Sequence, residues 1–138
     1  MNNTKSQYIP NPSYPVSSRP SFREAIAEAE KQIELHAIDR YHESAKEICF
    51  IIAEVYLMNP NAQIKISGEL LDGYLVQQVF RELTCEHVRL VLDNFHNVTY
   101  LVMNKKAYLR AALYNSVFEL NAHYTNLVNH HMKEQGEK

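Results

Sequence analysis

The residues best suited to bind a charged ligand form one short basic group late in the chain. Lys105, Lys106 and Arg110 lie close together, and Tyr108 stands among them. Basic side chains at the start of a helix can hold a phosphate, and a nearby aromatic ring can stack on a base. The same pattern is typical of an ordinary exposed helix face. The group therefore predicts at most a weak, salt-sensitive contact with DNA.

Seven histidines raise the question of a metal site. His123 and His130 are seven positions apart, so on one helix they share a face. A zinc site normally needs three or four converging ligands, and this segment has no HExxH motif and no paired cysteines. We expect no metal and no cofactor, and we interpret His130 as a capping or buried hydrogen-bonding residue near a helix end.

Motifs for covalent or hydrolytic chemistry are absent from the sequence. Cys85 and His87 would need a distant acid to form a nucleophilic site, and no motif supplies one. The sequence contains no G-x-S-x-G elbow and no phosphate-binding loop, and its three glycines make such loops hard to build. We therefore expect that the protein is not an enzyme.

Composition predicts a single helical domain with little attraction for phosphate. The chain has 138 residues, of which 46% are hydrophobic and 22% charged, with no Trp and a formal net charge of -2. Cys49 and Cys85 lie in apolar helical patterns, which predicts buried thiols in a reducing compartment. No secretory leader and no long apolar run occurs, so we expect a cytoplasmic protein without a membrane span.

The spacing of apolar residues predicts an all-α, compact bundle of about five to six helices. The expected helices cover residues 21–37, 41–58, 70–83, 85–95, 105–115 and 121–132. Ser21 with Glu24, Thr84 and Asn104 are suited to cap three of them. Residues 63–68 alternate apolar and polar side chains, which predicts at most one very short extended segment. The predicted core includes Ile48, Ile52, Val79, Leu92 and Leu113.

The distribution of proline and charge predicts three regions along the chain. Residues 1–20 hold four of the five prolines and read as a flexible linker or tail. Residues 21–132 form the helical domain, and residues 133–138 form a charged tail. Tyr8, Ile9, Tyr14 and Val16 in the first region could dock on the domain or on a partner, or stay exposed.

Two motifs late in the chain carry a resemblance to a known family. They are AYLRAALYN at residues 107–115 and YTNLVNH at residues 124–130, and weaker matches begin near Ile64. In order and spacing, residues 33–132 resemble the C-terminal domain of the replication initiator protein A family of plasmids and conjugative elements in Firmicutes.

The resemblance implies a DnaD-like helical domain that recruits host replication proteins, with primase the leading candidate and helicase-loading machinery next. The family's DNA-binding winged-helix half has no counterpart in this sequence, so origin recognition is not carried over. DnaD-type domains also have a Tyr-x-x-x-Ile-x-x-x-Trp signature. The nearest match here has Tyr108, Ala112 and Ser116, without the final aromatic residue, which weakens the expectation of DNA binding.

We therefore expect a non-enzymatic protein-interaction module of a mobile-element replication initiator. Two alternatives stay open, namely a DNA-binding module that assists origin remodelling and a structural oligomerisation domain. The expected contact residues are Lys105, Lys106, Tyr108, Arg110, Tyr114, His123, Tyr124 and His130.

Overall fold

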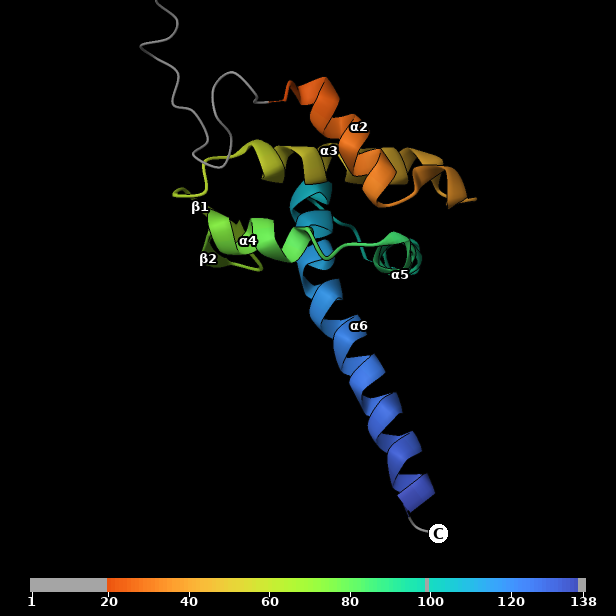
Figure 1. Cartoon of the computed structure of the whole chain (residues 1–138). Coiled ribbons are helices and arrows are strands. Elements are labelled where there is room, and N and C mark those ends of the chain that lie inside the picture. Colours follow the sequence, from red (N-terminus) through yellow and green to blue (C-terminus); the bar gives the residue numbers. More distant parts are fainter. Residues whose placement is uncertain (1–19, 99, 137–138) are drawn as a thin grey trace, which may run out of the picture.

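A computed structural model describes residues 20–98 and 100–136, with side chains as far as Asn121. The elements follow in the order α2 (Phe22–Gln32), η2 (Leu35–Ala37), α3 (His42–Leu57), β1 (Gln63–Ile66), β2 (Glu69–Asp72), α4 (Gly73–Phe80), α5 (Cys85–His96) and α6 (Lys105–Gly136). Helices α2 and α3 lie across one end of the bundle, and α4 and α5 lie on either side of the first turns of α6 (Figure 1). The predicted mostly helical bundle is confirmed.

Helix α2 begins where the capping pattern predicts, but it ends earlier than residue 37. The Ser21 N–H donates to Glu24 Oε1 at 2.8 Å, and the Glu24 N–H donates to Ser21 Oγ at 3.1 Å. The helix stops at Gln32, because Glu34 adopts a left-handed backbone conformation with a φ of 52° and a 3₁₀ turn follows. This bend allows Ile33 and Ile38 both to be buried.

The helix predicted over residues 70–83 is wrong in its first part, because β2 pairs antiparallel with β1 in the register Ile66 to Glu69. Ser67 and Gly68 have φ values of 54° and 84°, and two central residues with positive φ make the tight turn that matches strand twist. The single extended segment expected from sequence is therefore half of a hairpin. Helix α4 starts at Gly73, where a Cβ atom would lie 2.9 Å from the Ala62 carbonyl oxygen.

The two last predicted helices are one continuous helix, α6, which runs on through the first residues of the expected charged tail. No Gly or Pro lies between Lys105 and Gln135, and the Ser116 hydroxyl donates to the Leu113 carbonyl oxygen at 2.7 Å. Nothing in the segment between residues 115 and 121 therefore breaks the helical backbone. The later half of α6 projects away from the bundle (Figure 1).

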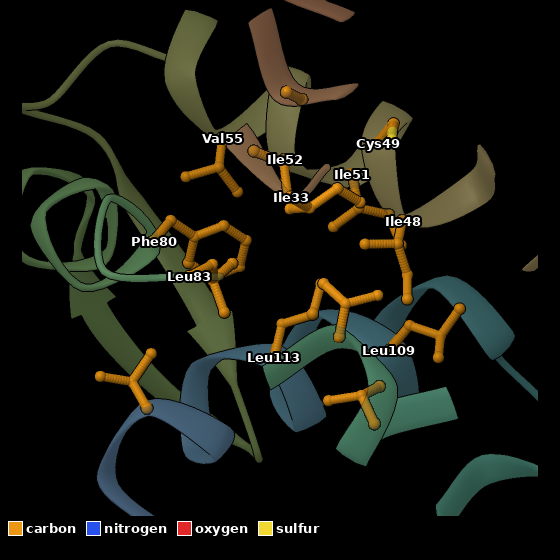
Figure 2. Close-up of a cluster of buried hydrophobic side chains, with 14 of the residues drawn as sticks. Ile33, Ile48, Cys49, Ile51, Ile52, Val55, Phe80, Leu83, Leu109 and Leu113 are labelled. Atoms are coloured by element: carbon orange, nitrogen blue, oxygen red, sulfur yellow. The ribbon is translucent and has the colours of Figure 1, made fainter. Parts of the chain in front are cut away.

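The core lies where α6 meets α3, α4 and α5. Side chains from α3, α4 and α6 converge in one cluster, with Leu109 and Leu113 of α6 across from the isoleucines of α3 (Figure 2). All five predicted core residues are buried: Ile48, Ile52, Val79, Leu92 and Leu113. Burial of Leu109 and Leu113 fixes the first turns of α6 on the bundle.

Two glutamines tie the helices together through their side-chain amides. Gln77 is buried, and its Nε2 donates to the Val55 and Met58 carbonyl oxygens at 2.9 Å each. Gln32 Nε2 donates to the carbonyl oxygens of Phe80 and Leu83, also at 2.9 Å. These bonds satisfy carbonyl groups that helix ends leave without intrahelical partners.

Candidate functional site

The cysteines are buried thiols, as the sequence predicts. Cys49 and Cys85 are both free and both buried. Burial, followed by the nearby charge of Glu30, raises the pKa of Cys49 to about 12. Because the thiolate is the nucleophilic form, Cys49 stays protonated and unreactive near neutral pH.

His87 caps a helix. The Thr84 N–H donates to His87 Nδ1 at 3.0 Å, and Thr84 Oγ1 lies 2.9 Å from the same nitrogen. Burial lowers the pKa of His87, while the carboxylates of Glu82 and Glu86 act in the opposite direction. Among the described residues no partner reaches His87 Nε2. This imidazole positions the start of α5, as the predicted Thr84 cap requires.

Lys105 and Lys106 of the predicted basic group face acidic residues of α3. Lys105 Nζ lies 2.5 Å from Glu47 Oε1 and 5.1 Å from the centre of the Phe95 ring. Lys106 Nζ lies 2.8 Å from Glu54 Oε2. Each of the two ammonium groups therefore has a carboxylate partner within the domain, which does not favour its binding a phosphate.

These ion pairs border a shallow hollow between the two helices, which we call the α3–α6 groove. Its lining consists of Glu47, Phe50, Ile51, Glu54, Lys105, Lys106 and Leu109. The hollow has a volume of about 200 Å³. Phe50 is 46% exposed, and its ring stacks on that of Phe22 with centroids 6.2 Å apart. The groove thus has an apolar floor between two ionic edges.

A second hollow, which we call the α6–hairpin surface, lies where the turn after β1 meets α6. Its lining includes Lys65, Ser67, Tyr108, Arg110 and Ala111. The hollow has a volume of about 440 Å³ and adjoins another that Ser67, Tyr108 and Ala111 also line. In the described part of the chain, no carboxylate pairs with Lys65 or Arg110. Glu119 lines the adjoining hollow.

Tyr108 is partly packed rather than free to stack on a base. Its ring lies 5.5 Å from that of Phe95. Desolvation, followed by the charge and hydrogen bond of Tyr100, raises the pKa of Tyr108. The residue thus acts as a wall of the α6–hairpin surface.

The same side of α6 continues into an aromatic pair. Tyr114 follows Arg110 by one helical turn and Phe118 follows Tyr114 by another, a spacing that places successive side chains on one face. The rings of Tyr114 and Phe118 lie 5.3 Å apart, and Phe118 is 51% exposed. An arginine and two aromatic rings therefore follow one another along this side of α6, with Arg110 and Tyr114 half-buried and Phe118 exposed.

The remaining predicted contact residues are His123, Tyr124 and His130. They belong to the projecting half of α6, and their side chains lie outside the described residues. Among the residues that the structure does describe, no three His, Cys, Asp or Glu side chains gather as metal ligands would. Within the same limits, no helix has both the length and the apolar character that crossing a membrane requires.

Sequence reasoning missed the acidic partners of the lysines and the contribution of the hairpin. Glu47 and Glu54 are seven positions apart, so both occupy one face of α3, and that spacing was a readable signal. Lys65 and Arg110 line one hollow because the hairpin lies against α6, and no short-range pattern in the sequence indicates this.

Comparison with known proteins gives one family match. Neither a curated protein nor a solved structure matches the chain. The model of the family of unknown function DUF6017 matches residues 12–135. Because this match covers nearly the whole chain, the protein belongs to the DUF6017 family.

Proposed function

We propose that this protein is a non-enzymatic docking module that binds an acidic segment of a replication protein through the α6–hairpin surface. The observation that carries the proposal is the row of Arg110, Tyr114 and Phe118 at one-turn spacing along α6, in which Arg110 and Tyr114 are half-buried and Phe118 is 51% exposed. Arginine and aromatic residues dominate the energetics of protein interfaces, because they combine large contact area with directed hydrogen bonds.

The charge of the surface favours a carboxylate-bearing partner. Lys65 and Arg110 have no described ion-pair partner, whereas Lys105 and Lys106 are paired with glutamates. An unpaired guanidinium can form a bidentate bond with a carboxylate without first breaking an internal ion pair. The partner segment would thus place an acidic residue at Arg110 and an apolar residue at Phe118.

The residues capable of catalysis have structural roles, which favours binding over chemistry. The Cys49 thiol is kept protonated by its raised pKa, and the Nδ1 atom of His87 is used at the start of α5. The replication context comes from the resemblance to replication initiators, and it makes primase the first partner to test.

The test measures binding of the full chain to purified bacterial primase and helicase-loading protein by calorimetry. Arg110→Ala and Phe118→Ala should each weaken binding about tenfold, which corresponds to about 1.4 kcal/mol. Lys106→Ala is the matched control, because Lys106 lies on the same helix but pairs with Glu54. Equal weakening by all three variants, or no binding of either replication protein by the wild type, would refute the proposal.

DNA binding is the alternative function, and the unpaired cations Lys65 and Arg110 would support it too. Titration with single- and double-stranded oligonucleotides at two salt concentrations separates the two functions. Affinity for DNA that falls steeply with salt and depends on Lys65 and Arg110 would favour the rival. Absence of DNA binding at low salt would remove it.

A further inference from the structure

The α3–α6 groove is an apolar hollow that the described residues leave open. Phe50, Ile51 and Leu109 form its floor, and Phe50 is 46% exposed. Leaving an aromatic ring half exposed forgoes part of the free energy that its burial would contribute. The groove therefore suits an occupant with apolar side chains.

The edges of the groove favour an occupant without charge. Its two ammonium groups pair with its two carboxylates, at Lys105 with Glu47 and at Lys106 with Glu54. A charged partner would have to compete with these existing pairs, whereas a neutral apolar segment would not.

The chain enters the bundle beside this groove. Pro20 directly precedes the cap residue Ser21, and Phe22 of the first turn stacks on Phe50 with an angle of 14° between the rings. Residues that precede α2 therefore start next to the groove floor. At about 3.1 Å per residue for an extended proline-containing segment, Tyr14 lies within about 25 Å of chain from Phe22. That reach exceeds the span from Phe22 to the groove lining.

The segment at residues 12–19 has the composition that the groove favours. It reads PSYPVSSR, with two prolines, Tyr14 and Val16, and its one charged side chain is Arg19. The family match starts at residue 12, so it covers this segment together with the helical domain, whereas Tyr8 and Ile9 lie outside the match.

We propose that residues 12–19 dock in the α3–α6 groove of their own chain, with Tyr14 and Val16 against Phe50 and Ile51. Proline-containing segments bind aromatic-lined grooves at a low cost in conformational entropy, because proline already restricts the backbone. The stacked rings of Phe22 and Phe50 supply such a lining. The proposal is independent of the docking function above, because the groove and the α6–hairpin surface share no lining residue.

The absence of tryptophan from the chain allows a direct test with a single fluorophore. Tyr14→Trp places the reporter in the proposed docking segment, and Tyr8→Trp is the matched control outside the family match. Quenching by acrylamide is measured for each full-length variant. We expect the quenching constant to be several-fold smaller for Tyr14→Trp, with emission shifted to shorter wavelength.

A second substitution connects the protection to the groove. Adding Phe50→Ala to Tyr14→Trp should raise quenching to the level of the Tyr8→Trp control. Phe22→Ala should act in the same direction, and circular dichroism checks that both variants keep their helical content. Equal quenching of the two reporters, or protection that survives loss of Phe50, would overturn the proposal. Protection that disappears on dilution would also overturn it, because it would identify a second copy as the source of the segment.

Discussion

The two sides of α6 use positive charge in opposite ways. On the α3–α6 groove, Lys105 and Lys106 are held by Glu47 and Glu54 and serve to join α6 to α3. On the α6–hairpin surface, Arg110 and Lys65 line a hollow without a described carboxylate partner. Lys106 and Arg110 are one helical turn apart, so they are neighbours where the two sides of α6 meet, yet the elements opposite them differ. The availability of a basic side chain for binding is thus set by what lies opposite it.

The largest expected effect is a difference in stability between substitutions on the two sides of α6. Leu109→Ala should lower the free energy of unfolding by about 2–5 kcal/mol, because Leu109 is fully buried beneath the groove. The neighbouring Arg110→Ala should change it by less than about 0.5 kcal/mol, since surface substitutions rarely do more. Chemical denaturation of both variants checks the difference. Similar losses for the two would mean that Arg110 is a packing residue.

Release of the paired lysines should convert the groove into a cationic surface. In the double variant Glu47→Gln and Glu54→Gln, Lys105 and Lys106 lose their carboxylate partners. We expect affinity for a single-stranded oligonucleotide at low salt to rise about tenfold over the wild type, and the gain to vanish at high salt. A quadruple variant that also carries Lys105→Ala and Lys106→Ala is the control. If the double variant binds no better than the wild type, the ion pairs are not what keeps these lysines from binding the oligonucleotide.

A moderate fall in pH should lower the stability of the fold through His87. Burial lowers the pKa of His87 in the folded protein below its ordinary value. Below about pH 6.5 the unfolded chain binds a proton at this residue that the folded chain resists. Stability should therefore fall as the pH drops through and below that value, and it should be independent of this group at higher pH.

The measurement is the free energy of unfolding between pH 7.5 and 5, compared with that of His87→Asn. The variant should lose this part of the pH dependence, whatever its absolute stability. An unchanged slope in the variant would assign the effect to another group.

The smallest expected effect is that of a single groove ion pair on stability. A double-mutant cycle on Lys106 and Glu54 should give a coupling energy of about 0.2–1 kcal/mol, because both side chains are roughly half exposed. The coupling should decrease with added salt. A coupling energy well above this range would mean that the ion pair is a main contribution to holding α6 against α3. The two sides of α6 would then differ in their contribution to stability as well as in their proposed function.

Local sequence patterns predicted much of the fold. The capping box at Ser21 and Glu24, the caps at Thr84 and Asn104, and the core residues Ile48 and Leu113 follow from local hydrogen bonding and helical periodicity. The hairpin was missed because the residues of β2 also fit a helical pattern, and only pairing with β1 decides between the two.

The sequence by itself determined the helical class, the burial of both thiols and the candidate residues on α6, because these depend on residue type and short-range spacing. Only the tertiary structure decided which of those candidates are available. Glu47 and Lys105 are far apart in the chain, and the turn at Ser67 reaches Arg110 only after the hairpin folds against α6. Whether charged residues far apart in the sequence pair with one another depends on how the helices pack. Two members of one basic group in the sequence therefore hold α6 against α3, and the third lines the proposed recognition surface.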